Sequence, residues 1–118
     1  MKKIIAILAV AAGSCAAVAA QASAFVAWKV TNLPFGDTLN VRKYPANTSQ
    51  KQAAYPAGAV LSMTGRCTDG LNLMSIQRQP MQVQIAKVRY RWCEVWHDPA
   101  RDGRYVTGWV YGKYIQPM

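Results

Sequence analysis

Side chains that commonly do chemistry are scarce in this chain. Its 118 residues include one histidine, His97, and five acidic residues against 14 Lys and Arg. A tetrahedral metal site needs three or four converging ligands, and His97 with its neighbour Asp98 supplies only two. We therefore expect no metal and no cofactor, and we interpret His97 as a surface or half-buried residue at the end of a strand.

Two kinds of side-chain pair could still support hydrolysis. A nucleophilic Cys–His pair needs a free thiolate at Cys67 or Cys93, and a disulfide between these cysteines would remove it. A carboxylate pair could be formed by Glu94 with Asp98 or Asp102, but acidic residues in a loop-rich region are usually solvated turn residues. We expect that the protein is not an enzyme, and a cell-wall hydrolase using Glu94 is the weakest alternative.

Aromatic residues are missing from the first 24 positions, where 18 apolar residues are found. This segment has a basic start, an apolar run and the small-residue ending Ala22-Ser23-Ala24. The pattern predicts a secretory signal peptide over residues 1–24, cleaved before Phe25, and hence an exported protein that is periplasmic or secreted. A retained membrane helix and a lipoprotein acylated at Cys15 are the alternatives.

The remaining segment, residues 25–118, is long enough for one compact domain and too short for two. It carries 12 basic and five acidic side chains, a formal net charge of +7. A domain of this size gains from a covalent cross-link, which an oxidising compartment allows. We expect a Cys67–Cys93 disulfide, the alternative being two free buried thiols.

Long helical periodicity is also lacking after the signal peptide, whereas runs with strand character recur between turn residues. Leu39 and Val41 alternate with polar residues, so we expect both to face the core. The segment 83–97 is expected to be extended, but its apolar alternation changes parity near Cys93, which requires a β-bulge or an exposed Trp92. The domain is predicted to be all-β, with five to six short antiparallel strands in a small barrel or sandwich.

Four sequence pieces in a fixed order resemble a bacterial Src-homology-3 domain. They are Leu-Asn-Val-Arg-Lys-Tyr-Pro at 39–45, Tyr-Pro-Ala-Gly-Ala-Val-Leu at 55–61, Trp-Cys-Glu-Val at 92–95 and Gly-Trp-Val-Tyr-Gly-Lys-Tyr-Ile at 108–115. The resemblance implies a small Src-homology-3-like barrel over residues 25–118. The segment 68–87 departs from the family pattern, and we expect an extended hairpin or loop there.

The resemblance also implies a ligand groove near the end of the domain. Eukaryotic relatives have Gly-x-x-Pro-x-x-Tyr there; this chain has Tyr111 at the proline position and keeps Tyr114 at the tyrosine position. Tyr44 and Trp92 are further candidate groove aromatics, although each of the four could equally be core or barrel cover. Trp109 is expected in the core.

Basic side chains are interleaved with aromatic ones late in the chain. We expect Arg89 and Arg91 to project from one face of a strand, as ligand-binding cations, with Trp92 on the opposite face. Such a surface suits anionic envelope polymers, whereas export argues against nucleic acid. A charged face kept for solubility is the alternative.

Bacterial members of this family are non-catalytic modules that hold cell-wall peptides or envelope proteins. We therefore expect a monomeric, exported binding module of the bacterial envelope that recognises peptidoglycan or a peptide or protein segment through aromatic and basic side chains. A protein-interaction or assembly scaffold without wall affinity is the alternative function. Fold alone does not decide between them.

Overall fold

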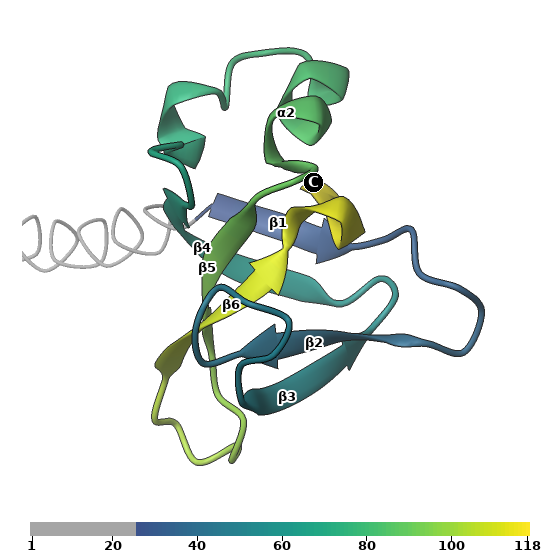
Figure 1. Ribbon diagram of the computed structural model, residues 1–118, viewed down its shortest axis with the longest axis vertical. Coiled ribbons are helices and arrows are strands. Elements are labelled where there is room, and N and C mark those ends of the chain that lie inside the picture. Colours follow the sequence, from purple (N-terminus) through teal and green to yellow (C-terminus); the bar gives the residue numbers. More distant parts are fainter. Residues whose placement is uncertain (1–25) are drawn as a thin grey trace, which may run out of the picture.

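The computed structural model describes residues 26–118, which form one seven-stranded antiparallel sheet with one short α-helix (Figure 1). The strand order is β3-β2-β6-β5-β4-β1-β7. The predicted signal peptide, its cleavage site and Cys15 lie outside the described residues. The strands are β1 (Val26–Val30), β2 (Thr38–Arg42), β3 (Lys51–Pro56), β4 (Val60–Cys67), β5 (Trp92–His97), β6 (Val106–Tyr111) and β7 (Ile115–Pro117).

The predicted antiparallel β-architecture is confirmed, but the sheet is not closed into a barrel and has more strands than expected. The two end strands, β3 and β7, each pair with one neighbour, β2 and β1 respectively. Closure would require these edges to exchange backbone hydrogen bonds. β7 has only three residues, and both edge strands end in proline, Pro56 and Pro117, which has no amide hydrogen to donate.

Alternating side chains bury one face of the sheet. Leu39 and Val41 of β2 are buried as predicted, and the same period of two buries Leu61 and Met63 of β4. A continuous core results, whose largest fully buried side chain is Trp28. The side chains at the alternate positions of each strand point to the opposite face of the sheet.

The predicted disulfide between Cys67 and Cys93 is present and joins β4 to β5. The two residues lie directly opposite each other in the antiparallel pair, and both are buried. Their sequence separation of 26 residues closes the loop that contains the segment 68–91. Such cross-links are typical of proteins from oxidising compartments.

The segment 68–91 consists of two short helices joined by turns, which corrects the expected extended hairpin at 68–87. It contains a 3-10 helix, η1 (Leu73–Ser75), and the helix α2 (Met81–Val88), which packs against β7 near the C-terminus (Figure 1). Leu73, Ile76 and Val88 are buried in the core cluster, so this segment packs against the sheet. Val88, which was expected in an extended segment, is the last residue of α2. We report no membrane-spanning helix within residues 26–118, since none there is long and apolar enough.

The change of parity near Cys93 has a simple origin in this arrangement. The chain leaves α2 at Val88 and re-enters the sheet only at Trp92, so the two halves of the segment 83–97 do not share one strand. Within β5, Cys93 and Val95 face the core, and Trp92 is half-buried. β5 pairs with β6 without a shift of register. Its pairing with β4 is irregular between Met63 and Cys67, opposite Val95 and Cys93, so the expected irregularity is present but the extra residues belong to β4.

Candidate functional site

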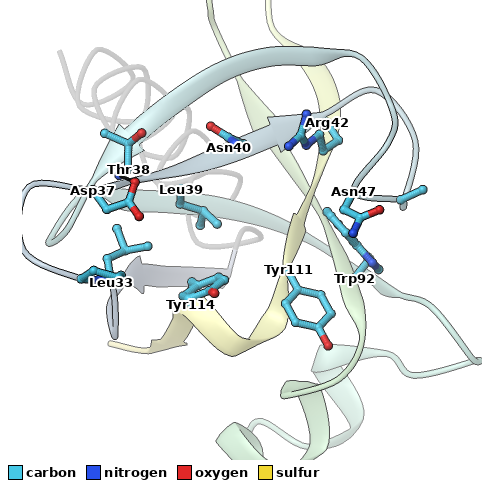
Figure 2. Close-up of a pocket in the computed structure, with 12 residues that line it drawn as sticks. Leu33, Asp37, Thr38, Leu39, Asn40, Arg42, Asn47, Trp92, Tyr111 and Tyr114 are labelled. Carbon is cyan, nitrogen blue, oxygen red and sulfur yellow. Dashed lines mark hydrogen bonds between the residues drawn. The ribbon is translucent and has the colours of Figure 1, made fainter.

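The described part of the chain has an open groove of about 750 Å³ (Figure 2). Five segments form it: the connection between β1 and β2, strand β2 itself, the connection between β2 and β3, the start of β5, and the chain from the end of β6 through the 3-10 helix η2 (Gly112–Tyr114). Its lining consists of Leu33, Pro34, Asp37, Thr38, Leu39, Asn40, Arg42, Ala46, Asn47, Trp92, Tyr111 and Tyr114.

Three aromatic rings follow one another along the groove. The ring centroids of Trp92 and Tyr111 are 5.3 Å apart, and those of Tyr111 and Tyr114 are 6.3 Å apart. In Figure 2, Tyr114 lies near Leu33, Trp92 lies near Asn47, and Tyr111 lies between them. All three aromatic side chains are half-buried, so each offers part of its ring surface to a ligand.

Sheet geometry explains this row. Trp92 begins β5, Tyr111 ends β6, and the two residues are direct partners in the antiparallel pair. Cross-strand aromatic pairs of this kind stabilise a sheet and hold their rings in register. Tyr114 follows one turn of 3-10 helix later, which returns its ring to the same side.

Polar side chains border the aromatic row. The guanidinium of Arg42 donates a hydrogen bond of 3.2 Å to the Ser49 carbonyl, which fixes it at the groove. The Asp37 carboxylate accepts a hydrogen bond from the Thr38 amide. Among residues 26–118, the side-chain amide of Asn47 has no hydrogen-bond partner, so its donors and acceptor are available to a ligand.

Three of the predicted ligand-binding residues thus meet in the groove, namely Trp92, Tyr111 and Tyr114. Tyr44 does not line it; it is 62% exposed, with the Lys43 ammonium 5.6 Å from its ring centroid. Trp109 is buried as expected, and the Arg66 guanidinium stacks over its ring at 5.1 Å.

Arg89 and Arg91 do not lie on one strand face, because the chain that carries them turns from α2 into β5. Arg91 donates from Nε to the Lys87 carbonyl at 2.8 Å and lies 3.6 Å from the Asp69 carboxylate. These contacts fix the base of the segment 68–91. Arg89 is exposed in the turn after α2 and lines a second, smaller cavity.

Sequence reasoning missed the polar border of the groove, although a signal for part of it was present. Because Leu39 and Val41 face the core, alternation along β2 places Asn40 and Arg42 on the other face, next to the end of β6. Asn47 lies in the following turn, whose position depends on the fold of the hairpin, and carried no such signal.

Glu94 lies outside the groove and is held by neighbouring strands. Its carboxylate accepts a hydrogen bond of 3.0 Å from the Thr64 hydroxyl and lies 3.6 Å from the Arg66 guanidinium. Asp98, its possible catalytic partner, accepts from the amides of Asp102 and Gly103 and shapes the loop after β5. Within residues 26–118, no three His, Cys, Asp or Glu side chains cluster as metal ligands would.

His97 is more buried than expected, at 4% exposure. Its Nε2 lies 2.9 Å from the Gln52 amide oxygen and its Nδ1 lies 3.0 Å from the Tyr55 hydroxyl. Since an amide oxygen can only accept, Nε2 carries the proton and Nδ1 accepts from Tyr55. Burial lowers the pKa of His97 below its ordinary value, and the nearby Asp98 charge opposes this only in part.

Comparison of the chain with protein-family models, with curated proteins and with solved structures found no match in any of the three. The functional conclusion therefore depends on the residues and geometry described above.

Proposed function

We propose that this protein is an exported, non-catalytic binding module of the bacterial envelope, with an arrangement of the Src-homology-3 type. The observation that carries the proposal is the row of three aromatic rings, Trp92, Tyr111 and Tyr114, along an open groove. Concave sites with aromatic walls and a few polar groups are the usual form of a binding site. The disulfide and the predicted signal peptide support export.

Peptidoglycan fits the groove chemistry. Sugar rings present C–H faces that pack on aromatic rings, and their hydroxyl and acetamido groups bond with side chains such as Asn47. The charged groups that line the groove are one acid, Asp37, and one base, Arg42, so the groove itself favours a ligand of low net charge. The formal charge of +7 on residues 25–118 adds a general attraction to the anionic envelope.

A protein segment is the second candidate ligand, and one observation favours it. Phe35 is fully exposed, at 107%, at the tip of the connection that also supplies Leu33 and Pro34 to the groove. Aromatic residues are enriched in protein–protein interfaces, and Phe35 together with the groove aromatics would give a partner such a surface. This version of the proposal is an interaction scaffold with no affinity for the wall.

The contacts of the Glu94 carboxylate argue against the hydrolase alternative. A hydrolase would need this carboxylate beside its substrate, whereas the carboxylate is bound by Thr64 and Arg66 and does not line the groove. We therefore expect no release of muropeptides from sacculi by the wild-type protein, and Glu94→Gln should leave that result unchanged.

Co-sedimentation with isolated sacculi tests the wall-binding version. We expect the wild-type protein to pellet with sacculi, Tyr111→Leu to reduce the retained fraction several-fold, and Tyr90→Leu to behave as wild type. Tyr90 is a matched control, because it is 74% exposed in the turn after α2 and does not line the groove.

Two outcomes would contradict the wall-binding version. Absence of the wild-type protein from the pellet at both low and moderate salt would remove it and leave the scaffold. Equal retention of both variants would show that binding does not use the groove.

A further inference from the structure

A second cavity, of about 200 Å³, lies on the other side of η2 from the aromatic groove. The connection after β1, the α2 helix and its following turn, and the chain from η2 into β7 form it together. It is smaller than the usual pocket for a drug-sized ligand, about 300–1,000 Å³, and so suits a small charged group with a short apolar stem.

The two cavities share one wall. Thr31 and Lys113 line the second cavity, whereas Leu33 and Tyr114 line the groove. The Thr31 amide donates to the Tyr114 carbonyl at 2.9 Å, and the Asn32 side-chain amide donates to the Lys113 carbonyl at 3.3 Å. These hydrogen bonds tie the two segments together and separate the spaces on either side.

Arg89 and Lys113 give the second cavity its charge. No acidic residue lines it, and neither cation forms an ion pair with any of residues 26–118. By contrast, Arg66 and Arg91 have Glu94 and Asp69 as partners. Each cation lies over the aromatic ring of its chain neighbour, Arg89 at 5.6 Å from the Tyr90 centroid and Lys113 at 5.7 Å from the Tyr114 centroid. Neither ring neutralises the charge, so two cations without an acidic partner at one small cavity attract an anion, and hydrogen bonds between such groups are stronger than neutral ones.

An apolar side chain and polar donors complete the lining. Ile85 of α2 is half-buried and lines the cavity together with Thr31 and Gln116, whose side chains can form hydrogen bonds. Ile85 can contact a short apolar stem while Arg89 and Lys113 bind the charged end. We propose that this cavity binds the anionic end of a ligand, a carboxylate or a phosphate, with Arg89 and Lys113 as its cationic contacts.

The segment 68–91 builds this second site. It provides Ile85 and Arg89, and it is held against η2 by close contact between Val88 and Gly112, where a Cβ atom would overlap the Val88 carbonyl oxygen. The site is separate from the aromatic groove, so it stands or falls independently of wall binding.

Titration of the purified protein with small probes, followed by NMR, tests the site. The probes are N-acetyl-alanyl-alanine with a free carboxylate, the same dipeptide as its C-terminal amide, and inorganic phosphate. We expect at least one of the two anions to cause saturable chemical-shift changes of the backbone N–H signals around Arg89 and Lys113. The dipeptide with an amidated C-terminus should cause none. Shifts with the dipeptide alone identify a carboxylate site, and shifts with phosphate alone identify a phosphate site.

Charge-removing variants make the test specific. Arg89→Gln and Lys113→Gln should each weaken binding about tenfold, since each removes one charged contact. Lys87→Gln is the matched control, because it removes the same charge from α2 at an exposed position that does not line the cavity. Tyr111→Leu, which alters the groove, should leave anion binding intact.

Three results would overturn the inference. They are no saturable shift with either anion, equal binding of the dipeptide and its amide, and an affinity that falls as much in Lys87→Gln as in Arg89→Gln.

Discussion

The aromatic groove and the second cavity share a wall but differ in chemistry. The groove is open, is lined by three aromatic residues and has one acidic and one basic residue. The second cavity is smaller, has no aromatic residue in its lining and has two basic residues. The antiparallel sheet positions the first through the pairing of Trp92 with Tyr111, whereas the helical segment 68–91 is needed for the second. One small domain can therefore offer stacking surface and positive charge at separate, adjacent places.

Loss of the disulfide should have the largest effect on stability, and it should affect the second cavity more than the groove. Replacing Cys67 and Cys93 with serine removes the cross-link that closes the loop containing 68–91, at a cost of about 3–4 kcal/mol in the free energy of unfolding. We expect local unfolding of α2, with loss of anion binding before loss of the groove. Chemical denaturation and hydrogen exchange of the α2 amides measure this, and equal stability of the double variant and wild type would contradict it.

A side chain at Gly112 should perturb the contact between the two regions. Gly112→Ala places a Cβ against the Val88 carbonyl oxygen, so α2 and η2 must move apart. We expect a loss of about 2 kcal/mol in the free energy of unfolding, as for other overpacked sites. Gly70→Ala is a matched control for close packing: its Cβ would meet no atom within 4 Å, although its positive φ adds its own strain. If Gly112→Ala and the wild type bind the anion with similar affinity, the position of α2 relative to η2 is not needed for anion binding.

Acid should lower the free energy of unfolding through His97, which is hydrogen-bonded to Gln52 and Tyr55 of β3. Its pKa is lowered by burial in the folded state, so the unfolded chain binds the proton more readily. This contribution to stability is present above the unfolded value of 6.5 and is lost as the pH falls through the folded pKa. Urea unfolding at several pH values measures it, with His97→Gln as the variant whose profile should be flatter between pH 7.5 and pH 5. Parallel profiles would contradict a neutral, buried His97.

Removal of Phe35 should have the smallest effect on stability and should distinguish the two ligands proposed for the groove. The ring is fully exposed, so Phe35→Ser should change the free energy of unfolding by no more than about 0.5 kcal/mol. If a protein segment is the ligand, crosslinking in intact cells should capture the same envelope protein repeatedly, and this capture should fall in the variant. Unchanged capture would exclude Phe35 from that interface.

Regular strands were predictable because their signal is local. Leu39 and Val41 alternate with polar residues between turns, and the order of strands along the chain follows from such patterns. The helix α2 was not predictable from the local sequence. It has only eight residues, and its apolar residues Met81, Val83 and Ile85 alternate with polar ones as they would in a strand. Packing of Val88 against Gly112 and the core selects the helix, and this contact is not visible in the local sequence.

The candidate site divides in the same way. Trp92, Tyr111 and Tyr114 could be singled out as groove candidates because they stand in the sequence pieces that carry the resemblance, and the structure brings all three to one groove. Arg89 and Arg91 were assigned to one strand face, but the turn after α2 sends Arg89 to the second cavity and Arg91 to the Lys87 carbonyl. Their roles depended on the helix that the pattern did not predict.

NMR titration with soluble peptidoglycan fragments tests the central claim, ligand binding by the aromatic groove, most directly. The account predicts saturable shifts of the Trp92 indole N–H and the Asn40 and Asn47 side-chain amides. The indole of Trp28, which is 1% exposed in the core, should not move. Saturable shifts that avoid the groove, or none at millimolar fragment, would contradict recognition of peptidoglycan by this groove.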